Sequence, residues 1–145
     1  MSVWEAVLFV VIFSVAAVGI IGAIICEQRD REFVRRTFTH RQLVPEVDFA
    51  RDCSPTVSAA IAERVRQVLA RICEEPVDSA LMQADDLLST ELGYCLDSLA
   101  FPDLVCNLEK EFGIKVKLRE LTGRETVRDV VRLVENKLAA LGVPD

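Results

Sequence analysis

Residues 6–26 form a run of 21 amino acids without a charged side chain, AVLFVVIFSVAAVGIIGAIIC. As an α-helix, which rises about 1.5 Å per residue, this run would be roughly 31 Å long, close to the hydrocarbon thickness of a bilayer. The run is apolar on every side, whereas a core helix of a small domain is amphipathic. The sequence therefore predicts a transmembrane anchor in residues 1–26, with Trp4 at one membrane interface.

A cleaved signal peptide is the alternative interpretation of this run. Signal peptides begin with a basic segment, but the leader MSVWE contains an acid and no base. A lipoprotein processing site also fits poorly, because two isoleucines precede Cys26. Five arginines follow the run between residues 29 and 41, and none precedes it. The positive-inside rule therefore predicts a single-pass membrane protein whose C-terminal part lies in the cytoplasm.

Composition excludes several classes of function. The formal net charge of −6 argues against nucleic acid as a partner, because phosphate binding needs a basic surface. Five cysteines without a Cys-x-x-Cys pair, and a single histidine, predict no metal site and no disulfide framework. Cys73 and Cys106 are expected to be buried as small apolar residues. The sequence contains no catalytic triad, no paired carboxylates at an identifiable pocket and no phosphate-binding loop, so it does not predict an enzyme.

A folded domain is expected after a charged linker. Residues 27–52 mix both signs of charge, and we expect an extended connection after Pro45. The domain is expected at residues 53–145, beginning with a helix that has Ser54 as its N-cap. Apolar residues of this helix recur every three or four positions, as on one helical face: Val57, Ile61, Val65, Val68 and Ile72.

Two further amphipathic helices and one short helix are expected. The first begins near Ser98 and ends at Gly113, and the short one surrounds residues 118–121. The last begins at Thr126, which is placed to form a capping box with Asp129. The predicted fold is thus all-α, with a single N-terminal transmembrane helix followed by a small bundle of three main helices plus one short helix.

The segment DSLAFPDLVCNLEKEFGIKV, residues 97–116, resembles the acyl carrier protein family. That family has Asp-Ser-Leu at the start of its second helix, which typically ends in Leu-Glu-x-Glu-Phe, as residues 108–112 do here. TVRDVVRLV, residues 126–134, is similar to the family's last helix. The resemblance covers roughly residues 55–141 and implies a carrier-like bundle. It departs from the family in a longer spacing before the aspartate, in Pro102, and in a lysine within the acidic helix.

The resemblance implies a covalent 4′-phosphopantetheine arm on Ser98, attached by a phosphopantetheinyl transferase. The thiol of the arm would hold an acyl group as a thioester. Asp97 would cap the helix, and Leu99 would contact the arm. The placement is physically reasonable, because a phosphodiester at the first residue of a helix lies at the positive end of its dipole.

The same resemblance implies that Asp103, Glu109 and Glu111 meet basic residues of partners, which would be enzymes that synthesise or transfer acyl groups. The expected function is a membrane-tethered acyl carrier protein, itself not an enzyme, that presents acyl groups to membrane-associated enzymes of lipid or fatty acid biosynthesis. The alternative is a membrane-anchored protein-interaction module with a carrier-like fold and no prosthetic group, in which Ser98 is only a helix cap.

Overall fold

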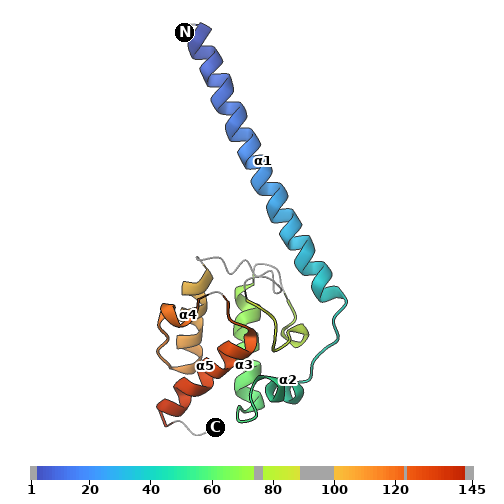
Figure 1. Ribbon diagram of the computed structural model, residues 1–145, viewed down its shortest axis with the longest axis vertical. Coiled ribbons are helices and arrows are strands. Elements are labelled where there is room, and N and C mark those ends of the chain that lie inside the picture. Colours follow the sequence, from blue (N-terminus) through green and yellow to red (C-terminus); the bar gives the residue numbers. More distant parts are fainter. Residues whose placement is uncertain (1–2, 74–76, 89–99, 123, 143–145) are drawn as a thin grey trace. The chain divides into compact units, whose positions relative to one another are not determined.

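The computed structural model describes residues 3–73, 77–88, 100–122 and 124–142 of the chain (Figure 1). It divides the chain into two compact units, Met1–Phe33 and Val34–Asp145. Within the described ranges all regular structure is helical, apart from one isolated antiparallel bridge, so the prediction of an all-α fold is confirmed. The helices and 3-10 turns are α1 (Val3–Thr39), α2 (Glu46–Cys53), α3 (Ala59–Ile72), η1 (Ser79–Leu81), α4 (Ala100–Phe112), η2 (Leu118–Glu120) and α5 (Val127–Ala140).

The first unit is formed by the N-terminal part of α1. Its described side chains at residues 12–25 are all exposed, and most of them are apolar. A search of the described residues finds no helix with the length and apolar character that crossing a membrane requires. The transmembrane helix predicted within residues 1–26 is therefore not supported by the described part of the chain.

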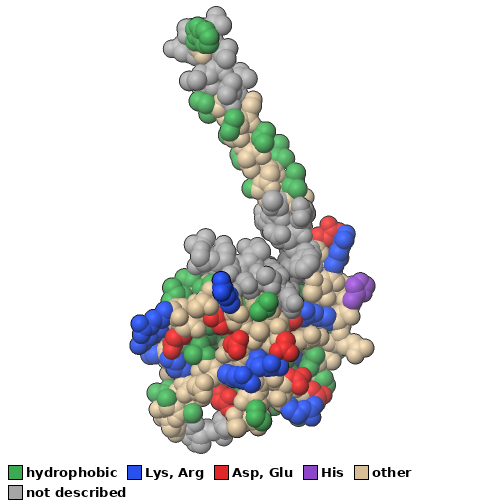
Figure 2. All heavy atoms as spheres, viewed as in Figure 1, with side chains coloured by type: hydrophobic (Ala, Val, Ile, Leu, Met, Phe, Trp, Pro, Cys, Tyr) green, Lys and Arg blue, Asp and Glu red, His purple; other side chains and the backbone are tan. Residues whose placement is uncertain are grey.

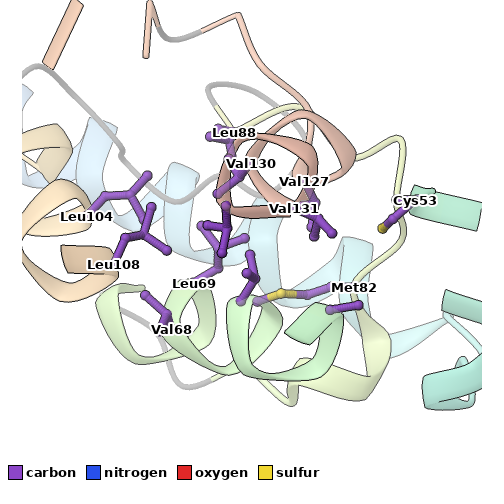
Figure 3. Packing of buried hydrophobic residues seen from close by; sticks show 14 of the residues in the cluster. Cys53, Val68, Leu69, Met82, Leu88, Leu104, Leu108, Val127, Val130 and Val131 are labelled. Carbon is purple, nitrogen blue, oxygen red and sulfur yellow. The ribbon is translucent and has the colours of Figure 1, made fainter. Parts of the chain in front are cut away.

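The second unit is organised around α3, which contacts α2, α4, α5 and η1. Of the apolar residues predicted to share a face of this helix, Val65 and Val68 are fully buried, as is Leu69, which the pattern did not include. Facing them are buried leucines of α4 and valines of α5 (Figure 3). Met82 and Leu88, from the segment after η1, fill the same core.

A helix occupies the segment where the sequence predicted an extended connection. α2 begins directly after Pro45, whose φ of −58° already suits the start of a helix. Its apolar face is buried in the core, with Phe49 only 1% exposed and Cys53 fully buried. Ser54, expected to be the N-cap of the next helix, has extended backbone and follows the end of α2 instead. The N-cap of α3 is Ser58, whose Oγ accepts a hydrogen bond from the N–H of Ile61 at 3.3 Å.

An ion pair holds the segment between α1 and α2 on the core. Arg41 Nη1 lies 2.6 Å from Asp86 Oδ2, and the two side chains are 14% and 2% exposed. Asp86 Oδ2 also accepts a hydrogen bond from the N–H of Gln83 at 2.8 Å. The guanidinium of Arg41 lies 4.9 Å from the ring centroid of Phe38, a buried residue near the end of α1. The segment that contains Phe38 and Arg41 therefore belongs to the packed second unit.

A buried arginine fastens α2 to α3. Arg66 is 1% exposed and pairs with Glu63 one turn earlier in α3. Its guanidinium lies 4.5 Å from the ring centroid of Phe49 and donates a hydrogen bond to the carbonyl oxygen of Val44 at 3.0 Å. The buried charge is thus both paired and hydrogen-bonded, as burial of a cation requires.

The last predicted helix is confirmed at its start. Thr126 and Asp129 form the expected capping box: the Asp129 carboxylate accepts from the Thr126 N–H at 2.9 Å, and the Thr126 hydroxyl accepts from the Asp129 N–H at 3.3 Å. The short helix predicted at residues 118–121 is η2. α4 ends as expected before Gly113, which has a φ of +65°.

Candidate functional site

The three residues predicted to hold the arm, Asp97, Ser98 and Leu99, lie outside the described residues. The structure describes α4 from Ala100, two positions after Ser98. In the sequence, Ser98 precedes the first described residue of α4, a helix of 13 described residues, by two positions. The described part of the candidate site is therefore α4 together with the elements that pack against it.

Pro102 is accommodated because it lies in the first turn of α4. The N–H groups of the first turn have no partner within a helix, so a residue without an N–H removes no helical hydrogen bond there. Asp103, which is exposed in the same turn, is favourably placed at the positive end of the helix dipole. That end of the helix fits a phosphodiester on a preceding residue for the same electrostatic reason.

Buried leucines fix the direction of α4. Leu104 and Leu108 are fully buried, and Figure 3 shows them pointing toward the side chains of α3 and α5. The prediction that this helix is amphipathic is therefore confirmed. The opposite side of α4 exposes Asp103, Cys106 and Lys110. The expectation that Cys106 is buried was wrong, because this residue falls on the solvent side of the helical period.

Glu109, one of the predicted partner-binding acids, has partners within the domain. Its Oε1 accepts a hydrogen bond from the N–H of Val116 at 3.0 Å, and its Oε2 lies 3.4 Å from Lys115 Nζ. These contacts, the backbone hydrogen bond above all, lower the pKa of Glu109. The side chain ties the end of α4 to the segment that follows Gly113.

Glu111, the second of these acids, joins α4 to α3. Its two carboxylate oxygens lie 3.1 Å from Arg71 Nη2 and 3.1 Å from Arg64 Nε. Hydrogen bonds from these two arginines, with Arg71 contributing most, lower the pKa of Glu111. The Arg64 guanidinium also lies 4.8 Å from the ring centroid of Phe112. Of the three predicted acids, Asp103 is the one whose carboxylate forms no ion pair with a described residue.

Of the basic side chains near the end of α4, the lysine within the acidic helix, Lys110, was singled out in the sequence, but Lys117 and Arg119 were not. Lys110, Lys117 and Arg119 are all exposed, and the last two lie in a segment that alternates apolar and charged residues. The alternation of IKVKLREL was available as a signal, because it places charged side chains away from the core. The described residues contain no group of three or more His, Cys, Asp and Glu side chains that could hold a metal ion.

Comparison with known proteins supplies the remaining evidence. Residues 63–134 match the family described as "Phosphopantetheine attachment site". A protein named acyl carrier protein, from Saccharopolyspora erythraea, is 40% identical over 81 residues, which are 56% of this chain and 81% of that protein. Another of that name, from Thermotoga maritima, is 40% identical over 62 residues, 43% of this chain and 74% of that protein. No solved structure matches the chain significantly.

Proposed function

Because the chain belongs to the acyl carrier protein family, in which a covalently attached 4′-phosphopantetheine is the working group, we propose that Ser98 carries this group here. Membership in this family makes the protein a carrier and not an enzyme. The single observation that carries the assignment to Ser98 is its place in the sequence. It is a serine within the matched residues 63–134, two positions before the described start of α4.

The chemistry of the following helix supports this residue. A phosphodiester carries a negative charge, and the first N–H groups of α4 have no helical acceptor. Serine offers a primary hydroxyl with little bulk, and the transferase supplies the catalytic groups for its modification. When bound, the arm supplies a thiol that holds an acyl group as a thioester. The chain positions the attachment point next to the N-terminal end of α4. Leu104 and Leu108 anchor this helix in the core.

The proposal extends to partners and setting. Carriers of this kind must meet a phosphopantetheinyl transferase and enzymes that load, transfer or extend acyl groups. Asp103 is exposed in the first turn of α4, next to the proposed attachment point, and is placed to meet a basic group of such an enzyme. Glu109 and Glu111, the other two predicted partner-binding acids, are already paired with Lys115, Arg64 and Arg71 within the domain, so Asp103 is the acid that carries the proposed contact.

The attachment is tested by intact-mass analysis of the full chain co-expressed with a broad-specificity phosphopantetheinyl transferase. Wild type is expected to gain the mass of one phosphopantetheine, and Ser98→Ala to gain none. Ser58→Ala is the matched control, because Ser58 is an N-cap serine of α3 and its replacement should leave the modification intact. Addition that persists in Ser98→Ala would assign the arm to another residue. A wild-type chain that stays unmodified would favour the interaction module without a prosthetic group.

Membrane tethering is a separate part of the proposal. Its support is the uncharged run at residues 6–26, together with the exposed apolar side chains at residues 12–25. Tethering would raise the effective concentration of the cargo near membrane-associated enzymes of lipid or fatty acid biosynthesis. The five arginines after the run support the proposal that the carrier domain lies on the cytoplasmic side.

Carbonate extraction of isolated membranes tests this location. We expect the wild-type chain to stay with the membrane fraction. Val15→Asp combined with Val18→Asp should release it, since each acid at the centre of a span costs about 3 kcal/mol on insertion. Gln28→Asp, beyond the uncharged run, is the matched control and should remain bound. Release of the wild type by carbonate would end the tethering proposal and leave the attachment proposal standing.

A further inference from the structure

The last turn of α4 exposes Lys110, and the turn η2 with the residue before it exposes Lys117, Leu118 and Arg119; these four residues are called here the η2 basic surface. α4 contacts η2, and the hydrogen bond from the Val116 N–H to Glu109 draws the intervening segment back along the end of the helix. Figure 2 shows Lys and Arg side chains spread over this face of the second unit, including the left edge, near which Figure 1 shows α4.

The acids between these bases are neutralised within the domain. Glu109 forms an ion pair with Lys115 and accepts a hydrogen bond from the Val116 N–H. Glu111 forms ion pairs with two arginines of α3. Glu120, inside η2, lies 2.8 Å from Lys137 Nζ and accepts from the Lys117 N–H at 2.7 Å. Lys110, Lys117 and Arg119, in contrast, form no ion pair with any residue that the structure describes. The surface is therefore locally positive on a chain of net charge −6.

An apolar side chain lies in the same surface. Leu118 is 52% exposed and stands between the two bases Lys117 and Arg119. Interfaces between proteins commonly combine an apolar contact with a surrounding polar rim. The charge pattern is opposite to the acidic helix that the family resemblance implied for partner binding. A basic enzyme would be repelled here, whereas an acidic chain with an apolar residue would be complementary.

We propose that the η2 basic surface docks an acidic segment of a partner protein, with Leu118 contacting an apolar residue of that segment. An anionic bilayer fits less well. Membrane-binding clusters typically contain about four to eight bases, whereas this surface has three bases that form no ion pair with a described residue, on an acidic chain. The docking does not use the phosphopantetheine arm, so it stands or falls independently of the assignment of Ser98.

Fluorescence anisotropy with the full chain, kept in neutral detergent, tests the proposal. The probe is a fluorescein-labelled synthetic peptide of alternating glutamate and leucine residues. Lys117→Glu combined with Arg119→Glu should weaken peptide binding about tenfold, because two attractive contacts become repulsive. The matched control is Arg35→Glu combined with Arg51→Glu, which changes the net charge equally at exposed sites outside the surface and should bind like wild type. Ser98→Ala should also bind like wild type.

A second arm of the experiment separates the possible sources of negative charge. Sedimentation with vesicles containing phosphatidylserine is compared for the same four proteins. Peptide binding that depends on Lys117 and Arg119 supports the proposal. Vesicle binding that depends on these residues, without peptide binding, overturns it in favour of a membrane surface. Equal weakening of the peptide by both double variants overturns it as well, because only net charge would then matter.

Discussion

The carboxylate of Glu109 accepts a hydrogen bond from the backbone N–H of Val116 at 3.0 Å, across the turn at Gly113. Val116 is 7% exposed, so its N–H is largely removed from water and needs this acceptor. The contact belongs to the local fold and fixes how η2 follows α4. An acid that resemblance assigned to partner binding thus has a structural role.

Replacement of Glu109 should lower stability in a graded way. Glu109→Gln keeps an oxygen that can accept from the Val116 N–H but loses the charge, whereas Glu109→Ala loses both. We expect the thermal midpoint at pH 7 to fall in the order wild type, Gln, Ala. Because the folded pKa of Glu109 is lowered, its stabilisation is present above the ordinary carboxyl pKa and is lost as pH falls through the folded value.

Circular dichroism melts between pH 7 and pH 3 measure this effect. The difference in thermal midpoint between wild type and Glu109→Gln should become smaller toward acid pH. A gap that stays constant over the whole range would contradict a contribution from the carboxylate charge.

Gly113 should resist substitution because of its backbone alone. Its φ is +65°, and a Cβ at this position would meet no atom within 4 Å, so conformation and not crowding sets the cost. We expect Gly113→Ala to lower the free energy of unfolding by about 1 kcal/mol. Gly113→Asn should cost less, since asparagine tolerates this region. Urea denaturation compares the two variants, and equal costs would point to a different cause.

Phe49 should contribute as much to the free energy of unfolding as the buried residues of α3. Its ring is 1% exposed, and truncation to alanine should cost about 3 to 5 kcal/mol of unfolding free energy. Val47→Ala is the matched control in the same helix, because Val47 is 68% exposed. Similar urea midpoints for the two variants would show that α2 is dispensable to the domain.

Replacing only one partner of the Arg41–Asp86 ion pair should lower the free energy of unfolding. Arg41→Met leaves the carboxylate of Asp86, 2% exposed, without its cation, and we expect a loss of about 3 kcal/mol. Arg51→Met serves as the control, because Arg51 pairs with Asp48 at the surface, where such pairs contribute about 0 to 1 kcal/mol. A loss no larger than that of the control in urea titrations would refute a role for the buried pair.

The cysteines should differ sharply in reactivity. Burial raises the pKa of the Cys53 thiol to about 12, while Cys106 is exposed on α4. Peptide mapping after brief iodoacetamide treatment should find Cys106 alkylated in the folded chain and Cys53 only after unfolding. Alkylation of Cys53 at the rate of Cys106 under native conditions would contradict its burial.

The same thiol predicts a dependence of stability on alkaline pH. Since the folded pKa of Cys53 lies above its ordinary value of 9.0, the folded state holds the proton more tightly. The contribution of the Cys53 thiol to the free energy of unfolding is complete below pH 9 and declines as pH rises toward 12. Cys53→Ala should remove this decline, and urea midpoints at pH 8 and pH 10.5 measure it.

Local signals explain what the sequence could predict. The start of α5 followed from Thr126 and Asp129, and the end of α4 from Gly113, because caps and turns are set by neighbouring residues. α2 was missed because a helix of eight residues has too short a pattern to stand out. Its stability comes from Phe49 and from Arg66, which belongs to another helix.

The candidate site divides in the same way. Ser98 was identified through a resemblance, and the comparisons support the family to which that resemblance pointed. The inward pairing of Glu111 could not be predicted, because Arg64 and Arg71 are 47 and 40 residues away in sequence. Solvent exposure of Cys106 follows from the helical period of α4, because Leu104 and Leu108 occupy the side that faces the core.

The position of Arg66 has a practical consequence for chimaeric carriers. The family match begins at residue 63, inside α3, yet the aromatic lid over the Arg66 guanidinium comes from residue 49. A chimaera joined at residue 63 would contain Arg66 but would lack Phe49, the ring that packs on its guanidinium. Recombination points placed upstream of Phe38 would move the carrier as an intact module.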